Sequence, residues 1–208
     1  MTIIKRTSIV LKLVIAGMAV VISNITFGEG AAEAGKTKAA TCAACHGPDG
    51  NSTTPEWPKL AGQHGAYLAK QLKDFKSGVR KNPVMSPMAS PLGDQDIEDL
   101  SAFYSAQKST PGSADPKYVK AGEQLYRGGN AETGVPACMA CHGPAGSGNP
   151  AAGYPALRGQ HAAYTATQLR ALKSGERSND ANSVMRTIAA KMTEPEIEAV
   201  ASYIEGLH

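Results

Sequence analysis

Aromatic side chains are scarce in this sequence. Of its 208 residues only 5% are Phe, Trp or Tyr, and a single tryptophan is present, although 42% of the residues are hydrophobic. A chain of this length suffices for one ordinary domain or two small ones, and few large side chains are available to fill their cores. The composition therefore favours a fold in which a large bound apolar group supplies part of the core.

An excess of charge of either sign is also lacking. Residues 1–28 contain three basic and no acidic residues, and the rest of the chain contains 18 of each sign. Each half is balanced as well, with nine basic and nine acidic residues in 29–109 and again in 110–208. A surface that binds nucleic acid would require more basic than acidic residues in at least one half of the chain. Nucleic acid is therefore excluded as a partner.

Only one long apolar run is present, and it lies near the N-terminus. Three basic residues precede the run at 13–22, and small and polar residues follow it. This pattern predicts a signal peptide over 1–28, with a cleavage boundary between 28 and 34, and export to the periplasm. A spanning helix needs about 20 apolar residues, which is more than this run provides. An uncleaved membrane anchor is therefore the alternative, and it would hold the protein at the membrane surface.

The two halves of the chain repeat one pattern. "TCAACHGPDGNS" matches "ACMACHGPAGSG", and "WPKLAGQHGAYLAKQL" matches "YPALRGQHAAYTATQL". The offset grows only from 96 to 100 residues, which is typical of a duplicated domain and too long for a solenoid repeat. Between the copies lies a segment rich in Ser, Pro and Gly. We predict an N-terminal domain over 29–106, a linker over 107–116 and a C-terminal domain over 117–208.

Both halves are predicted to be helical at their ends. The last segment of each half carries apolar residues at the spacing i, i+3, i+4 and i+7 that is typical of an amphipathic helix. Thr193 and Glu196 form a capping box at the start of the second of these helices. No segment alternates apolar and polar residues as a strand would, so the fold class is all-α. The apolar positions are Ile97, Leu100, Ser101 and Tyr104, and Ile197, Val200, Ala201 and Ile204.

A helix is also predicted at the start of each half. Asp115 and Pro116 provide an N-cap and a first-turn proline for the second copy, and residues 31–42 form the matching helix. Gly35 and Gly122 lie within these helices, where a glycine costs about 1 kcal/mol relative to alanine and usually marks a close approach. We therefore expect the first helix of each half to cross the last.

The four cysteines form two Cys-x-x-Cys pairs, each followed at once by a histidine. A zinc half-site, a redox dithiol and haem attachment all use this spacing. The pairs lie 96 residues apart in separate repeats, and the strand-to-helix pattern of a thioredoxin-type dithiol is missing. The adjacent histidine therefore decides for two covalent c-type haems, one per half. The predicted attachment residues are Cys42, Cys45, Cys138 and Cys141, with His46 and His142 as the first axial ligands.

With these motifs the sequence resembles the dihaem cytochrome c4 family over residues 30–208, including the linker, the GQH segments and the terminal "YIEGLH". The resemblance implies tandem cytochrome c domains and single-electron transfer, with no enzymatic activity. It also implies a bc1-type complex as donor and a terminal cytochrome oxidase as acceptor in a respiratory chain. The alternatives are a haem subunit of a sulfide or alcohol dehydrogenase, and a dihaem peroxidase.

The second axial ligands are predicted to be methionines, as the resemblance also implies. Alignment of "NPVMSPMASPLGDQDI" with "NSVMRTIAAKMTEPEI" pairs Met85 with Met185 and leaves Met88 and Met192 without methionine counterparts. If equivalent positions bind both irons, Met85 and Met185 are the ligands, and the other two are packing residues. A thioether ligand raises the reduction potential, which suits a carrier that delivers electrons to an oxidase.

Further residues that repeat are expected to support these ligands. Pro58 and Pro155 match the position at which related cytochromes c use a proline carbonyl to accept the N–H of the axial histidine. His64 and His161 begin helical stretches, where we expect them to hydrogen-bond a haem propionate or fix the helix. The alternatives for these two histidines are a solvated surface position and iron ligation.

Several basic residues near the methionine segments are candidates to neutralise haem propionates. A solvated loop charge is the alternative role for each of them. The residues are Arg80, Lys81, Arg177 and Arg186.

Overall fold

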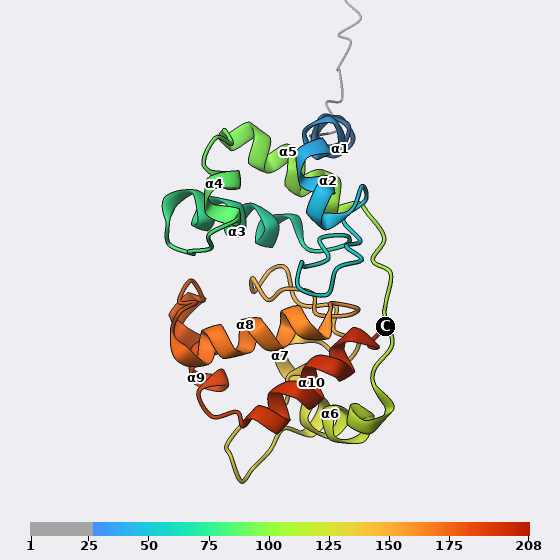
Figure 1. The fold of residues 1–208 in the computed structure, drawn as a ribbon, viewed down its shortest axis with the longest axis vertical. Helices are drawn as coiled ribbons and strands as arrows, with labels where there is room; N and C mark the ends of the chain where they lie inside the picture. Colours follow the sequence, from blue (N-terminus) through green and yellow to red (C-terminus); the bar gives the residue numbers. More distant parts are fainter. Residues whose placement is uncertain (1–26) are drawn as a thin grey trace, which may run out of the picture.

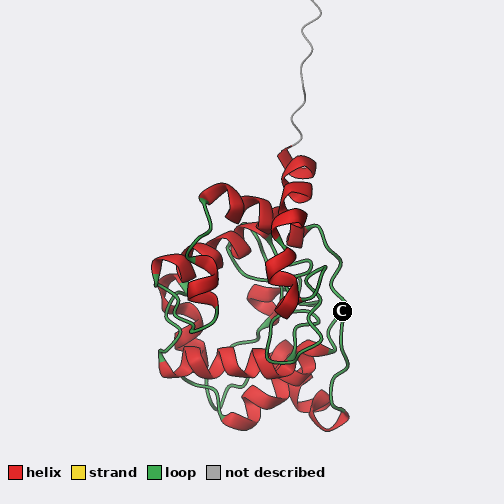
Figure 2. Ribbon diagram, turned by 45° about the horizontal axis from the view of Figure 1, so that its top comes forward, coloured by secondary structure: helices red, strands yellow, loops and turns green. Residues whose placement is uncertain are grey.

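The computed structural model describes residues 27–208, and their side chains from residue 31. The predicted signal peptide at 1–28 lies outside the described residues except for its last two positions. Within 27–208 the chain forms ten α-helices and one 3-10 helix, with isolated bridges but no strand (Figures 1 and 2). The predicted all-α fold is therefore confirmed. None of the helices in this part of the chain has the length and apolar character needed to cross a membrane.

Two helical halves follow one another along the chain and lie at opposite ends of the molecule in Figure 1. Each half has the same order of α-helices, with a first helix, a short helix that ends in a histidine, a long helix, a short helix and a last helix. The N-terminal half holds α1 (Phe27–Lys38), α2 (Ala40–His46), α3 (Gly65–Ser77), α4 (Met85–Ala89) and α5 (Asp94–Ser105). The C-terminal half holds α6 (Pro116–Gly128), α7 (Met139–His142), α8 (Ala162–Ser174), η1 (Ala181–Ser183), α9 (Val184–Ala189) and α10 (Glu194–Glu205).

The ends of two helices follow the predicted capping residues. At α6 the Asp115 side chain accepts a hydrogen bond from the Lys117 N–H at 3.0 Å, and Pro116 occupies the first turn. At α10 the capping box of Thr193 and Glu196 is present in both directions. The helix predicted over 31–42 differs, because a turn at the buried residue 39 divides it into α1 and α2.

The predicted crossings of first and last helices are confirmed in both halves. A Cβ atom on Gly35 in α1 would collide with the Asp99 carbonyl and lie 2.7 Å from the Phe103 Cβ. A Cβ atom on Gly122 in α6 would likewise collide with the Ala199 carbonyl and lie 2.6 Å from the Tyr203 Cβ. Only glycine permits the two backbones to approach this closely.

The segment between the halves is hydrogen-bonded to both of them. The Thr110 N–H donates to the Asn51 side chain at 2.9 Å in the N-terminal half. The Gly112 N–H donates to the Glu205 carbonyl at 3.0 Å in the C-terminal half. The predicted linker is largely exposed, and these hydrogen bonds hold its backbone to both halves.

Each half has its own apolar core, and the first cysteine of each pair lies at its edge. Cys42 packs against a cluster formed by Ala39 and residues of α3 and α5, and Cys138 packs against a larger cluster that includes Met192. The prediction that Met192 is a packing residue is therefore confirmed. The same prediction for Met88 is wrong, because this side chain is 39% exposed.

Candidate functional site

Two short helices present the cysteine motifs. Cys42 and Cys45 lie three residues apart in α2, and Cys138 and Cys141 occupy the N-cap and third residue of α7. Side chains three residues apart share one face of a helix, so each pair of thiols points the same way. All four cysteines are free and partly buried. Burial raises the pKa of the Cys138 thiol to about 11, so this group is neutral at physiological pH.

The histidine that ends each short helix is buried and oriented by a proline carbonyl. His46 Nδ1 lies 2.8 Å from the Pro58 oxygen, and His142 Nδ1 lies 2.9 Å from the Pro155 oxygen. An Nδ1–H that donates to this carbonyl leaves Nε2 free for a metal. Burial lowers the pKa of both imidazoles, and the carbonyl opposes this shift only in part. Both rings are therefore neutral, as metal ligands must be.

The predicted methionine ligands lie at the start of two short helices: Met85 is the first residue of α4, and Met185 is the second residue of α9. Met85 is partly buried, and its N–H donates to the Asn82 side chain at 2.8 Å. Met185 is partly buried and packs against the C-terminal core. Before it, Asn182 and Ser183 have φ angles of 53° and 57°, in the left-handed region that non-glycine residues rarely adopt. Both methionines thus occupy defined positions, and their axial roles remain predictions.

The two supporting histidines have different surroundings. His161 is buried, with Nε2 2.8 Å from the Ser52 carbonyl of the other half and Nδ1 3.3 Å from the Glu205 carboxylate. Both of its nitrogens are therefore engaged by the protein. His64 Nε2 is buried and has no hydrogen-bond partner among residues 27–208. An acceptor supplied by a bound group, such as a propionate oxygen, would satisfy it.

Two arginines lie between the halves and have neutral hydrogen-bond partners. A buried guanidinium normally needs a carboxylate or phosphate, because an unpaired buried charge is costly. A bound group with carboxylates of its own fits this place. Arg80 donates to Gln71, Gln168 and Tyr164, at 2.7, 2.7 and 3.1 Å, and Arg177 donates to Tyr67, Gln168 and Gln71, at 2.9, 3.0 and 3.3 Å.

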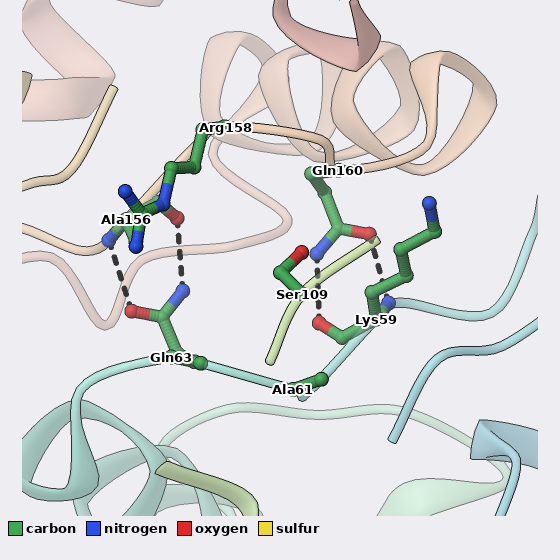
Figure 3. Close-up of a pocket in the computed structure, with 8 residues that line it drawn as sticks. Lys59, Ala61, Gln63, Ser109, Ala156, Arg158 and Gln160 are labelled. Atoms are coloured by element: carbon green, nitrogen blue, oxygen red, sulfur yellow. Dashed lines mark hydrogen bonds between the residues drawn. The ribbon is translucent and has the colours of Figure 1, made fainter. Parts of the chain in front are cut away.

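Two further residues, Gln63 and Gln160, join the halves directly, and the sequence alone assigned them no role. Gln63 Nε2 donates to the Ala156 carbonyl, and the Ala156 N–H donates to Gln63 Oε1, both at 2.9 Å. Gln160 forms the same pair of 2.9 Å bonds with the backbone of Lys59 (Figure 3). The repeated GQH segment was the only signal that pointed to them.

Similarity to known proteins agrees with this arrangement. The Cytochrome c family profile matches residues 32–107 and 119–208, one match for each half. Cytochrome c4 of Stutzerimonas stutzeri is 51% identical over 197 residues, which cover 90% of this chain and 94% of that protein. The chain belongs to the cytochrome c4 family. The crystal structure of reduced recombinant cytochrome c4 from Pseudomonas stutzeri superposes with a TM-score of 0.83 at 52% identity, covering 85% of this chain and 98% of that one.

The chain is also similar to a protein named for a particular electron donor. A thiosulfate dehydrogenase electron acceptor of Stutzerimonas stutzeri strain A1501 is 41% identical over 173 residues, which cover 81% of this chain and 80% of that protein. As a cytochrome c4, the present chain is a dihaem electron-transfer protein that carries two covalent haem c groups. The paired thiols, the neutral histidines that follow them, the unsatisfied His64 nitrogen and the two arginines without carboxylate partners all fit this cofactor.

Proposed function

We propose that the protein is a periplasmic carrier that passes single electrons along a respiratory chain, from a bc1-type complex to a terminal cytochrome oxidase. The observation that carries this proposal is the twofold repetition of one site, in which a buried neutral histidine follows a pair of thiols in each half. The predicted signal peptide over 1–28 supports export. The domain boundaries proposed are 29–106 and 117–208, joined by residues 107–116.

Each half would hold its haem with equivalent residues. The haem iron supplies the redox chemistry by alternating between its ferric and ferrous states. The chain holds the group covalently, fixes the orientation of the axial imidazole through a proline carbonyl, and keeps water away with its apolar core. The proposed residues are Cys42, Cys45, His46, Pro58 and Met85 in the first half, and Cys138, Cys141, His142, Pro155 and Met185 in the second.

The ligand assignment is tested by replacing each methionine with histidine. A thioether ligand favours the ferrous state more than an imidazole does, so Met85→His lowers the potential of one haem and Met185→His that of the other. The exposed Met88 provides a matched control, and Met88→Leu leaves both potentials unchanged. Spectroelectrochemical titration of the purified holoprotein measures these values.

Two outcomes would contradict the assignment. A methionine variant with two unchanged potentials would show that the residue is not a ligand. High-spin ferric iron in the wild-type protein at neutral pH would show an open coordination position, and it would favour the dihaem peroxidase.

A second candidate function is the acceptor of a dehydrogenase that acts on a sulfur compound. It is favoured by the 41% identity to a protein named as a thiosulfate dehydrogenase electron acceptor. Stopped-flow reduction by purified thiosulfate dehydrogenase and by a purified bc1 complex separates the two proposals. Reduction by the dehydrogenase at the faster second-order rate would favour the second candidate.

A further inference from the structure

The repeated GQH segment places each glutamine beside a proline carbonyl of the opposite half, and this carbonyl accepts the hydrogen bond of the proposed axial histidine. Figure 3 shows Gln160 against the backbone of Lys59 and Gln63 against the backbone of Ala156. Lys59 directly follows Pro58, and Ala156 directly follows Pro155. Each glutamine therefore bonds the residue after the proline whose carbonyl faces an axial histidine.

One peptide group makes both contacts in the N-terminal half. The peptide that joins Pro58 to Lys59 accepts the His46 Nδ1–H through its C=O at 2.8 Å. The N–H of the same peptide donates to Gln160 Oε1 at 2.9 Å. The chain of two hydrogen bonds thus runs from a glutamine of one half to the axial histidine of the other.

The C-terminal half contains the same arrangement with the roles of the halves exchanged. The peptide that joins Pro155 to Ala156 accepts from His142 Nδ1 at 2.9 Å and donates to Gln63 Oε1 at 2.9 Å. Because the connection occurs twice with matching distances, it is a property of the interface between the halves and not of one loop.

Each glutamine is itself held firmly by its own half. Gly62 and Gly159 precede the glutamines, both with a φ of +69°. Their N–H groups donate to the Tyr104 and Ile204 carbonyls at the ends of α5 and α10, at 2.9 and 3.0 Å. The glutamine Oε1 atoms also accept from the next N–H in the chain. The partners are His64 for Gln63, at 2.9 Å, and His161 for Gln160, at 3.1 Å.

Hydrogen bonds in such a chain strengthen one another. A peptide that donates through its N–H is polarised, and its C=O becomes a better acceptor. A better acceptor draws the Nδ1–H of the histidine more strongly and makes the imidazole a stronger electron donor to a bound metal. Stronger donation favours the ferric state and lowers the reduction potential.

We propose that Gln160 is a positioning residue for the haem held by His46, and that Gln63 is a positioning residue for the haem held by His142. Each half thereby adjusts the potential of the haem in the other half, and the coupling is present only while the two halves are docked. The proposal rests on the assignment of His46 and His142 as iron ligands.

The test replaces each glutamine by leucine in the haem-loaded protein. In Gln160→Leu the Lys59 amide loses its protection from hydrogen exchange, and the potential of the N-terminal haem rises while that of the C-terminal haem stays unchanged. Gln63→Leu gives the opposite pattern, with the Ala156 amide and the C-terminal haem affected. Amide exchange is measured by NMR on the reduced protein, and NMR signals of each haem followed through a redox titration give the two potentials separately.

Two further variants keep the test decisive. Gln160→Glu retains an acceptor for the Lys59 N–H, so this amide stays protected; the variant is read at the amide alone because its charge lowers both potentials. Gln160→Asn keeps an amide side chain that is too short to reach, and it replaces Gln160→Leu if the leucine variant fails to take up haem.

Two results would overturn the proposal. Potentials that move together in both leucine variants would show a general loosening of the interface. An unchanged reduction potential in a variant whose amide has lost its protection would show that the glutamine hydrogen bond does not affect the potential of the haem. Failure of the ligand assignment is recognised separately, because the wild-type absorption spectrum would then lack the signature of low-spin iron with histidine and methionine ligands.

Discussion

The carboxylate of Glu196 fixes the first turn of α10. It accepts hydrogen bonds from the Thr193 N–H at 2.7 Å and from the Asn130 side chain at 2.8 Å. Burial alone would raise the pKa of this carboxyl group, but the hydrogen bonds from Thr193 and Asn130 outweigh burial and hold the pKa below its usual value. The ionised form is therefore preferred in the folded protein.

Replacing Glu196 by Gln should destabilise the protein by about 1 kcal/mol at pH 7, the usual magnitude of a helix cap. A folded pKa below the unfolded value means that the stabilisation is complete above about pH 4.3 and is lost as the pH falls through the lowered pKa. The difference between wild type and variant therefore shrinks in acid. Urea unfolding of the holoprotein at several pH values measures it.

Glu123→Gln is the matched control for this experiment. Glu123 is an exposed residue of α6 that pairs with Arg127 four residues later. Such pairs contribute no more than about 0.5 kcal/mol, so the control variant stays close to wild type. A Glu196→Gln variant as stable as this control at pH 7 would contradict the assigned role.

Residue identities were predictable where a repeated chemical pattern fixed them, and Met88 shows where this failed. The cysteines and histidines follow from an attachment motif, which does not depend on the surrounding fold. The exposure of a side chain does depend on that fold. Between Arg80 and Met85 the offset to the second half changes from 97 to 100, and the three added residues lie before Asn182. The two loops therefore differ in course, and the partly buried Ile188 says little about the exposed Met88.

At the scale of the elements, the crossings of first and last helices limit which residues can replace the glycines at the crossing points. Gly35→Ala and Gly122→Ala each place a methyl group against a carbonyl of the opposing helix. Overpacking of this kind costs about 1–3 kcal/mol. We expect a loss of stability in this range for each variant, measured by urea unfolding of the holoprotein.

Gly128→Ala is the control, because it lies in the same helix as Gly122. A Cβ atom at Gly128 meets no atom within 4 Å. Alanine is the better helix former by up to about 1 kcal/mol, so this variant is as stable as wild type or more stable. Equal losses in Gly122→Ala and Gly128→Ala would show that the crossing does not determine the effect.

Helix ends were predictable from local chemistry, whereas the division of the first helix was not. Asp115, Pro116, Thr193 and Glu196 satisfy backbone groups within a few residues of themselves, so their effect is visible in the sequence. The turn at residue 39 has no such signal, because neither proline nor glycine marks it. Burial of Ala39 in the N-terminal core accompanies this turn, and burial is a tertiary effect.

At the scale of the whole molecule, Arg177 places a positive charge between the halves. It donates to Tyr67 and Gln71 of the N-terminal half and to Gln168 of its own half. A positive charge favours the ferrous state of a nearby haem. Arg177→Gln therefore lowers both potentials, by on the order of 1 kcal/mol of redox free energy for a unit charge in a partly buried site.

Arg127→Gln removes an exposed charge at the surface of α6 and is the control for this variant. Both variants are titrated spectroelectrochemically at the same ionic strength. A control that shifts the potentials as much as Arg177→Gln would show that net charge, and not the place of Arg177, is responsible.

The contacts between the halves were beyond sequence reasoning. Gln63 and Gln160 form hydrogen bonds with residues 93 and 101 positions away, and these contacts depend on how the two halves pack together. No local period or capping rule encodes that placement. The repetition of GQH showed that the glutamine is present in both copies, but not which residues it contacts.

The fixed linker bears on how electrons move within the molecule. Two domains joined by a flexible linker must diffuse into a productive orientation, and this diffusion slows as the viscosity of the solvent rises. Here the backbone between the halves is bonded to Asn51 on one side and Glu205 on the other. We expect the rate of electron exchange between the haems, measured by pulse radiolysis, to be the same in buffer and in glycerol, because neither half has to move before the electron is transferred.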